Sequence, residues 1–337
     1  MTEKTYDVAV VGATDLVGEA IIEHLGVRGF PVGTLYPLAA GDAAGGRVQF
    51  CEKSISIRPV EDFDFSRVQI AFFADTDEVS AKFVPKAAGA GCVAIDTSAE
   101  FRNDEDVPLV VPEVNPELIR QYNQSNIIAS PDCPTVQMVV ALKPIYDAVG
   151  IDRINVLVQQ SASALGRDAV EELAAQTAAL LNMKPIKSSV FSKQIAFNSL
   201  PCTDQPLDHG YTKDEQAIID STKKIFADSE LKVNPSISTI PVFFGCSQAL
   251  HIETKNKISV DAVTKLVSLA PSVKLIEGDC PTVVTDAVGK DSVFVGRVRE
   301  DLSCLSGLDL WVVADNVRKG AALNSIQIAQ ILIKEYL

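Results

Sequence analysis

The chain has 337 residues, 47% of them hydrophobic, and a formal net charge of −14 at pH 7, with a pI near 4.7. This length predicts about two domains, each with enough apolar residues for a packed core. The negative charge argues against two classes of partner that are themselves polyanions, nucleic acids and anionic membrane surfaces. It leaves open a local basic pocket for a small anion.

Cysteine usage and hydropathy disfavour further classes. The seven cysteines are scattered, with no C-x-x-C pair and no His/Cys cluster of zinc spacing, so we expect no metal site. Free thiols fit the reducing cytoplasm, which is the expected location. No apolar run approaches the roughly 18 residues of a membrane span. The polar residues 1–5 lead directly into a strand pattern, so we expect no signal peptide.

The first motif is a strand, a glycine turn and a helix. Residues 6–12 are apolar and β-branched, which predicts a buried parallel strand, and apolar residues after Gly18 recur at helical spacing. The turn between them, Gly12-Ala13-Thr14-Asp15-Leu16-Val17-Gly18, is typical of a dinucleotide-binding βαβ unit. Asp15 replaces the glycine that lets backbone approach a pyrophosphate, so its carboxylate should repel that ligand. Alternatively, the turn only joins strand to helix in a doubly wound sheet.

The following segments extend this domain. A strand at 33–38 ends in Tyr36-Pro37-Leu38-Ala39-Ala40, which supplies neither an acid for the ribose of NAD nor Ser or Arg for the 2′-phosphate of NADP. We predict strands at 68–74 and 92–96, a helix at 79–89, and a further strand and turn at 109–115. Arg102 follows a strand end, where α/β proteins bind ligands. It either holds a phosphate or carboxylate or is an ordinary surface arginine.

Cys133 lies in a polar break between an apolar segment, 126–129, and a helix-like run, 136–142. A thiol just ahead of a helix start feels the unsatisfied N–H groups and the positive end of the helix dipole, which favour the thiolate. Thiolates prepared in this way are enzymatic nucleophiles. The alternative is that Cys133 is a small apolar core residue.

The second half of the chain has a different pattern. A loop of small residues at 162–166 and an amphipathic helix at 168–181 are followed by a final helix at 323–337. The predicted strands are 152–160, 236–244, 249–253, 293–298 and 308–314. This pattern predicts an α+β domain with a large, mainly antiparallel sheet and helices on one face.

Several blocks together resemble the bacterial aspartate-β-semialdehyde dehydrogenase family over essentially the full length, and most closely its Usg-type paralogues, whose active sites have drifted. The matching blocks are the glycine turn, the stretch 107–115, the cysteine loop 129–135, Ala196-Phe197-Asn198, Gly210-Tyr211-Thr212, Asp286-Ala287-Val288-Gly289 and 310–322. The resemblance implies an α/β Rossmann-type dinucleotide-binding domain at 1–130 and an α+β catalytic/dimerisation domain with a large mixed sheet at 131–315. Residues 316–337 would form a C-terminal helix that packs back on the first domain.

The family reaction, in amino-acid biosynthesis, is the NADPH-dependent reductive dephosphorylation of β-aspartyl phosphate through a cysteine thioester. The resemblance implies NADP as the cofactor and a homodimer formed through the second domain; the charge and hydropathy described above already argue against nucleic acid and membrane partners. Carried over by position, Cys133 falls on the nucleophile, Arg102 on the phosphate-binding arginine and Gln160 on the glutamine that positions the acyl group. The residues expected at the cofactor are Gly12, Thr14, Val17, Gly18 and Asn316.

The departures from the family pattern are concentrated at the positions expected to bind the substrate and cofactor or to carry out catalysis. Cys246 stands in place of the acid/base histidine, Thr239 in place of the arginine that binds the substrate carboxylate, and Ala217 in place of a substrate-binding lysine. Other departures are Ser130 and Asp132 for asparagines, Thr76 and Asp77 for a double glycine, and Ala164 and Leu165 in a serine-glycine-alanine-glycine loop. An acid beside Cys133 disfavours the thiolate. Cys246 could act poorly as an acid/base group or pair with Cys133 as an oxidised dithiol.

None of the three histidines is expected to replace the missing one. His251 lies five positions after Cys246 on a predicted strand, and an odd offset points it to the opposite face. We expect His24 to be a surface or cap residue and His209 a solvated loop residue. The sequence therefore predicts weak or lost family activity and doubtful NADP binding. The alternatives are an active oxidoreductase on another acyl phosphate or aldehyde, and a non-catalytic binding or interaction protein.

Overall fold

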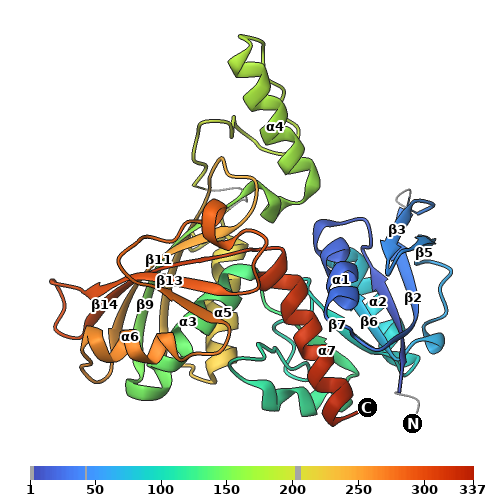
Figure 1. The fold of residues 1–337 in the computed structure, drawn as a ribbon, viewed down its shortest axis with the longest axis horizontal. Coiled ribbons are helices and arrows are strands. Elements are labelled where there is room, and N and C mark those ends of the chain that lie inside the picture. Colours follow the sequence, from blue (N-terminus) through green and yellow to red (C-terminus); the bar gives the residue numbers. More distant parts are fainter. Residues whose placement is uncertain (1–3, 42–43, 202–205) are drawn as a thin grey trace. The chain divides into compact units, whose positions relative to one another are not determined.

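In a computed structural model that describes residues 4–41, 44–201 and 206–337, the chain divides into two compact units. The first unit comprises Met1–Asp132 with Ala321–Leu337, and the second comprises Cys133–Gly320. Each unit is built on its own six-stranded sheet (Figure 1). Within the described residues, none of the helices combines the length and hydropathy that crossing a membrane requires.

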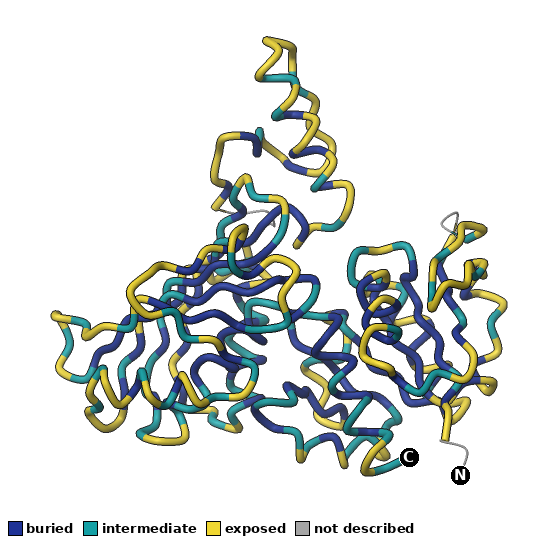
Figure 2. The backbone as a smooth tube through the Cα atoms, in the orientation of Figure 1, coloured by how far each residue is buried: buried dark blue, intermediate teal, exposed yellow. Residues whose placement is uncertain are grey.

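The sheet of the first unit is entirely parallel, in the order β5-β2-β1-β6-β7-β8. Its strands are β1 (Tyr6–Val11), β2 (Val32–Ala39), β5 (Arg58–Pro59), β6 (Ile70–Phe73), β7 (Val93–Asp96) and β8 (Ile127–Ala129). The central strands β1, β6 and β7 are almost wholly buried (Figure 2), as their continuous apolar runs predict. A hairpin of β3 (Arg47–Phe50) and β4 (Lys53–Ser56) follows β2.

Helices pack around this sheet. They are α1 (Leu16–Val27), α2 (Asp77–Gly89), the short 3₁₀ segments η2 (Phe65–Arg67) and η3 (Pro116–Gln124), and α7 (Leu323–Glu335). Although α7 is the last helix in the sequence, it contacts α1, η3 and β7. Asn324 fixes it by donating from Nδ2 to Val110 O at 3.0 Å and to Ser130 Oγ at 2.8 Å.

The sheet of the second unit is mixed, in the order β10-β9-β11-β14-β13-β12. Its strands are β9 (Ile151–Gln160), β10 (Lys232–Thr239), β11 (Cys246–Thr254), β12 (Val273–Ile276), β13 (Val293–Glu300) and β14 (Gly307–Ala314). The β9–β10 and β12–β13 pairs are parallel, and the other pairs are antiparallel. A parallel sheet in one unit and a mixed sheet in the other confirm the predicted fold class.

One face of the mixed sheet is covered by a layer of helices, α3 (Cys133–Val149), α5 (Lys213–Phe226) and α6 (Val260–Ser268), in which α3 contacts both of the others. Along β9, Ile154, Val156 and Val158 are buried, whereas the alternate residue Leu157 is 43% exposed. Since alternate residues of a strand point to opposite faces, much of the other face of β9 is open. The short segments η4 (Ala162–Leu165) and η5 (Val283–Ala287) also belong to this unit, and η6 (Arg318–Ala322) spans the point in the sequence where it ends.

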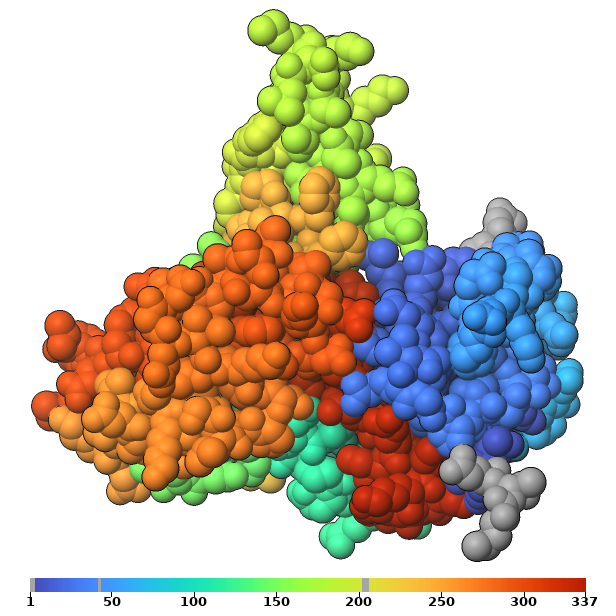
Figure 3. Space-filling view, in the orientation of Figure 1, coloured from blue at the N-terminus to red at the C-terminus, as the bar shows by residue number. Residues whose placement is uncertain are grey.

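Helix α4 (Arg167–Leu181) projects from the second unit as an arm (Figures 1 and 3). Its buried Glu172 binds the chain that returns beside it. The Glu172 carboxylate accepts hydrogen bonds from the backbone N–H groups of Ser189 at 2.7 Å and Val190 at 2.6 Å, and from Ser189 Oγ at 2.8 Å. Gln176, one turn later, accepts the N–H of Ile195 at 3.0 Å. Two side chains of α4 thus hold the second half of the arm.

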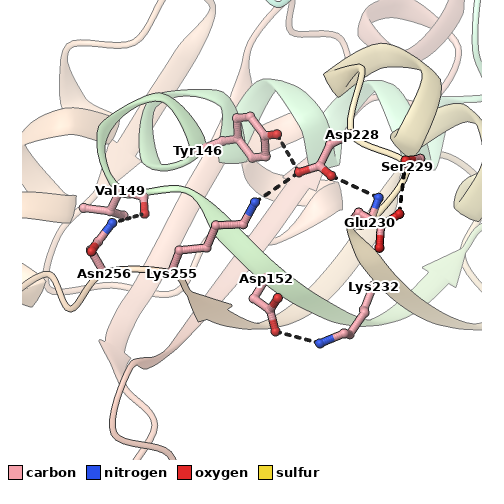
Figure 4. Close-up of polar contacts among 9 residues, drawn as sticks. All are labelled: Tyr146, Val149, Asp152, Asp228, Ser229, Glu230, Lys232, Lys255 and Asn256. Atoms are coloured by element: carbon pink, nitrogen blue, oxygen red, sulfur yellow. Dashed lines mark hydrogen bonds and ion pairs between the residues drawn. The ribbon is translucent and has the colours of Figure 1, made fainter.

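At the far end of α3, three elements meet through Asp228 (Figure 4). Tyr146 Oη donates to its carboxylate at 2.8 Å, and Lys255 Nζ lies 3.3 Å from the same oxygen. Burial, with the hydrogen bond to Asp228, raises the pKa of Tyr146 to about 12, and that bond lowers the pKa of Asp228. The phenol and the carboxylate therefore hold their usual protonation states at neutral pH, which maintains the link.

Three expectations about local structure are wrong. Residues 109–115 do not form a strand: Leu109 makes one isolated bridge to Ala129, and a turn follows. The strand predicted at 236–244 ends at Thr239, because the chain turns at Ile240–Pro241 to reach β11. His24 is neither a surface nor a cap residue. It is 1% exposed, since it lies on the face of α1 that packs into the unit.

Candidate functional site

Cys133 is the first residue of α3, directly after the Ser130-Pro131-Asp132 break that follows β8. Its side chain is partly buried. Gly320 packs against it so closely that a Cβ on this glycine would lie 2.3 Å from the Cys133 sulfur. The predicted position of the thiol at a helix N-terminus is confirmed, and the place of Gly320 in the matching block has a steric reason.

Three of the residues singled out in the sequence form a row across neighbouring strands of the second unit. Gln160, at the end of β9, pairs with Thr239 of β10 on one side and with Cys246 of β11 on the other. Cys246 pairs in turn with Ala314 at the end of β14. The Gln160 amide donates to the Thr239 hydroxyl at 3.2 Å, so these two neutral side chains satisfy each other.

Cys246 is 1% exposed, and its sulfur accepts a hydrogen bond from Nε2 of the fully buried Gln137 at 3.5 Å. Gln248 also ties β11 to the start of α3, because its amide donates to Pro134 O at 2.8 Å. The helix start that carries Cys133 therefore lies against the strand that carries Cys246. Sequence reasoning missed Gln137, although its position four residues after Cys133 puts both on one side of the helix.

Asn316 is buried and makes internal contacts. Its Oδ1 accepts the N–H of Gly245 at 2.7 Å, and its amide lies within 3.1 Å of Ser163 Oγ. Ser163 also contacts Ser161 at 3.0 Å. This network fixes the turn before β11, which sets the direction of Cys246. Ala217, at the expected lysine position, is partly buried in α5.

Arg102 lies in the first unit, in the loop that follows β7. Its guanidinium donates to Thr97 O at 2.6 Å and Ser130 O at 3.2 Å, and its Nη1 is 3.8 Å from a carboxylate oxygen of Asp132. Both side chains of this ion pair are largely buried. In the sequence, Asp132 is notable only as the neighbour of Cys133. Its contact with Arg102 is visible only in the tertiary structure.

The glycine turn joins β1 to α1 as predicted. Gly12 has a φ of +80°, and a Cβ on it would meet Ala74 O at 2.2 Å; a Cβ on Gly18 would meet Gly12 O at 2.0 Å. These glycines are therefore required by the backbone packing alone. Thr14 and Val17 are partly buried within the turn. Asp15 is the exposed N-cap residue of α1, so its carboxylate lies where a helix N-terminus would otherwise favour a bound anion.

The start of α2 is also acidic. Thr76 caps this helix through the N–H of Val79 at 3.4 Å, and Asp77 accepts the N–H of Ala99 at 2.8 Å. Asp75 precedes them, and burial raises the pKa of its carboxyl group. Thr76 and Asp77 stand where the family resemblance implies a double glycine beside the cofactor. Both side chains make hydrogen bonds, and that of Asp77 is acidic.

Neither of the histidines of the second unit, His251 and His209, is a member of the row formed by Thr239, Gln160 and Cys246. His251 lies on the face of β11 opposite to Cys246, as predicted, half exposed and 2.6 Å from Asp309. His209 is exposed in a loop, as predicted, with its ring 5.6 Å from that of Tyr211. The part of the chain that the structure describes contains no group of three His, Cys, Asp or Glu side chains able to hold a metal ion.

Two family models match the chain. Residues 7–122 match "Semialdehyde dehydrogenase, NAD binding domain", and residues 142–319 match "Semialdehyde dehydrogenase, dimerisation domain". Cys133 lies between the two matched ranges, and it is also the residue at which the second compact unit begins.

Named relatives agree with the family models. An aspartate-semialdehyde dehydrogenase from Shewanella sp. (strain DB6705) is 51% identical over 333 residues, covering 98% of each chain. A crystal structure of aspartate semialdehyde dehydrogenase II from Vibrio cholerae superposes with a TM-score of 0.98 at 50% identity, covering 99% of this chain and 100% of that one. A USG-1 protein homolog from Azotobacter vinelandii is 39% identical over 330 residues, 98% of each chain.

Proposed function

Since this chain belongs to the aspartate-semialdehyde dehydrogenase family, we propose that it keeps the family's architecture while its phosphate-dependent dehydrogenase activity is weak or lost. The observation that carries the proposal is Cys246. A buried thiol held by Gln137 stands where the resemblance expects an acid/base histidine. Loss of a general acid/base group lowers a rate by about 10²–10⁴.

The neighbours of Cys246 support the same conclusion. Thr239, where the resemblance expects an arginine for the substrate carboxylate, is 1% exposed and hydrogen-bonded to Gln160. A neutral hydroxyl cannot form the bidentate, charge-assisted contact that a guanidinium makes with a carboxylate. Asp132 neutralises Arg102 from within the protein. A phosphate would have to compete with this carboxylate for the guanidinium.

We infer that dinucleotide binding is weakened as well. The NAD-binding domain family and the glycine turn support a Rossmann-type cofactor. However, Asp15 and Asp77 place carboxylates at the starts of α1 and α2. These negative charges disfavour a pyrophosphate, because a carboxylate at a helix N-terminus cancels the attraction of that helix end for other anions. We propose that the first unit retains the cofactor domain's fold with reduced affinity for NADP.

An assay of the purified protein tests the proposal. Phosphate-dependent reduction of NADP by aspartate semialdehyde is expected to proceed below about 10⁻¹ s⁻¹, against about 1–10³ s⁻¹ for ordinary enzymes. NADP is expected to cause no resolvable rise in melting temperature, since ligands stabilise a protein only by binding its native state. The Vibrio cholerae relative, assayed beside it, is the positive control. Turnover at ordinary enzyme rates would refute the proposal.

A second candidate function rests on Cys133. Its place at the N-terminus of α3 favours the thiolate, so the chain could be an oxidoreductase that acts on another acyl phosphate or aldehyde. This candidate predicts that iodoacetamide modifies Cys133 several-fold faster than the exposed Cys51 and Cys280, as measured by peptide mass spectrometry. Equal rates at all three thiols would count against it. Aldehydes or acyl phosphates that protect Cys133 would identify the substrate.

We also propose that the protein forms a homodimer through the second unit. It rests on the dimerisation-domain match and on the open face of the mixed sheet around Leu157, which is 43% exposed. Leu157→Glu is expected to convert the dimer to a monomer in sedimentation velocity, because a carboxylate buried in the interface would lose its hydration. Leu302→Glu, at a residue 98% exposed in the β13–β14 connection, is the matched control. A wild-type monomer, or a dimeric Leu157→Glu variant, would contradict this assignment.

A further inference from the structure

A cavity of about 540 Å³ lies in the first unit, and its lining includes none of the residues assigned above as catalytic, substrate-binding or cofactor-binding candidates. Its walls are the C-terminal part of α1, the first six residues of β2 and the β3–β4 hairpin (α1, β2 and β3 are labelled in Figure 1). The glycine turn ends at Gly18, in the first turn of α1, and the cavity lining begins at Leu25, about 10 Å further along the helix axis. The cavity volume is in the range of pockets that bind small molecules.

The lining of this cavity has an unusual charge for such an acidic protein. The chain carries a net charge of −14, yet the residues lining the cavity include Lys53 and Arg58 and no aspartate or glutamate among those the structure describes. Thr34 and Ser56 add hydroxyl groups. A cationic pocket in an anionic protein concentrates small anions.

The remaining lining is apolar and aromatic. Phe30, Tyr36 and Phe50 line the cavity, together with aliphatic residues of α1, β2 and β4. Tyr36 is held in place by two arginines: Arg67 donates to its hydroxyl at 3.1 Å, and the Arg58 guanidinium lies 5.8 Å from its ring centre. Aromatic walls favour a flat ring, while the cations favour a negative substituent on it.

The hairpin that forms one wall is internally ordered. Arg47 donates to Ser54 Oγ at 2.7 Å and to Ser56 Oγ at 2.9 Å, which binds β3 to β4 across the hairpin. The turn carries Cys51 and Glu52 at φ values of +44° and +63°. The nearby carboxylate of Asp7 accepts a hydrogen bond from the backbone N–H of Thr34 at 2.6 Å. The cavity is thus bounded by fixed elements, with the exposed thiol of Cys51 in its lining.

From this combination we propose that the cavity is a binding site for a small planar aromatic anion, a ring that bears one carboxylate or phosphate group. The ring lies among Phe30, Tyr36 and Phe50, and Lys53 and Arg58 hold the anionic group. This site is independent of the dehydrogenase residues, so its occupancy does not depend on whether the chain is catalytically active.

The test uses the full-length protein with 2-naphthoate and its neutral counterpart 2-naphthamide, measured by isothermal titration calorimetry. We expect 2-naphthoate to bind with a dissociation constant of about 1 mM or tighter, and 2-naphthamide at least about fivefold more weakly. Bound 2-naphthoate should also slow iodoacetamide modification of Cys51 and leave that of Cys280 unchanged. Equal affinity for the two compounds, no binding of either, or unprotected Cys51 would overturn the proposal.

Variants locate the binding. Lys53→Met is expected to weaken 2-naphthoate binding about fivefold, and Lys53→Met with Arg58→Met about 25-fold, with little effect on 2-naphthamide. Lys290→Met, an exposed substitution in the second unit with the same change in net charge, should leave the affinity unchanged. Thr34→Trp should fill the cavity and abolish binding. An equal loss in the Lys290→Met variant, or full binding by a folded Thr34→Trp variant, would refute the site.

Discussion

Replacing Cys246 by histidine and Thr239 by arginine is expected to raise phosphate-dependent reduction of NADP by aspartate semialdehyde at least about 10²-fold over the wild type. The histidine would supply the missing general acid/base group, an effect of about 10²–10⁴ in rate. It would stand on β11 beside Gln160 and against the start of α3, where Gln137 now contacts the thiol. The arginine would supply a bidentate partner for the substrate carboxylate.

The control for this gain is Cys133. Adding Cys133→Ser to the double variant should remove the new activity, since the thioester needs the thiol. Both introduced side chains are larger than the ones they replace in a buried row, and overpacking costs about 1–3 kcal/mol. Near-UV circular dichroism therefore has to show a folded protein before rates are compared. A folded double variant without gain, or a gain that survives Cys133→Ser, would contradict the assignment of Cys246.

Glu172→Gln is expected to loosen the arm formed by α4. The wild-type carboxylate accepts backbone hydrogen bonds from Ser189 and Val190 and a further one from the hydroxyl of Ser189. An amide keeps one acceptor oxygen and turns an NH₂ group toward these donors. Each donor left unsatisfied costs about 1–3 kcal/mol, so the returning segment should open more readily by about 2–4 kcal/mol. Hydrogen exchange at residues 187–191 should accelerate at least about 30-fold.

Glu171→Gln is the matched control, because this neighbour on α4 is exposed and its substitution should leave exchange unchanged. The wild type should respond to acid in the same region. Burial opposes ionisation of Glu172, but hydrogen bonds from Val190 and Ser189 outweigh it and lower the pKa. Because the pKa of Glu172 is lower in the folded state, its ionisation stabilises the fold at pH values above the unfolded-state pKa of about 4.3. This stabilisation is lost as the pH falls through the folded-state pKa. Exchange in Glu172→Gln should lack this acid response.

Local sequence patterns predicted the regular elements well. The apolar runs at 6–12 and 92–96 are central strands of a parallel sheet, and the amphipathic run at 168–181 is α4. Prediction was poorer where local patterns are ambiguous. The apolar run at 109–115 has strand composition but only one bridging partner, and the strand expected at 236–244 turns at Pro241 after Thr239. Strand composition does not specify whether a neighbouring strand is available to pair.

By itself, the sequence determined the identity of the chemical groups. Cys133 stands before a helix, Cys246 and Thr239 replace charged or titratable family residues, and Asp15 interrupts a glycine turn. These facts follow from composition and order, because local propensity and charge are properties of the residues themselves.

Only the tertiary structure decided which of these groups meet. Arg102 and Asp132 are 30 positions apart and form an ion pair, and Gln137 reaches across 109 positions to Cys246. The cavity under the β3–β4 hairpin gathers Lys53 and Arg58 beside residues of α1 and β2. Such contacts depend on strand order and helix packing, which arise from cooperative burial of the whole core and leave no signature at any single position.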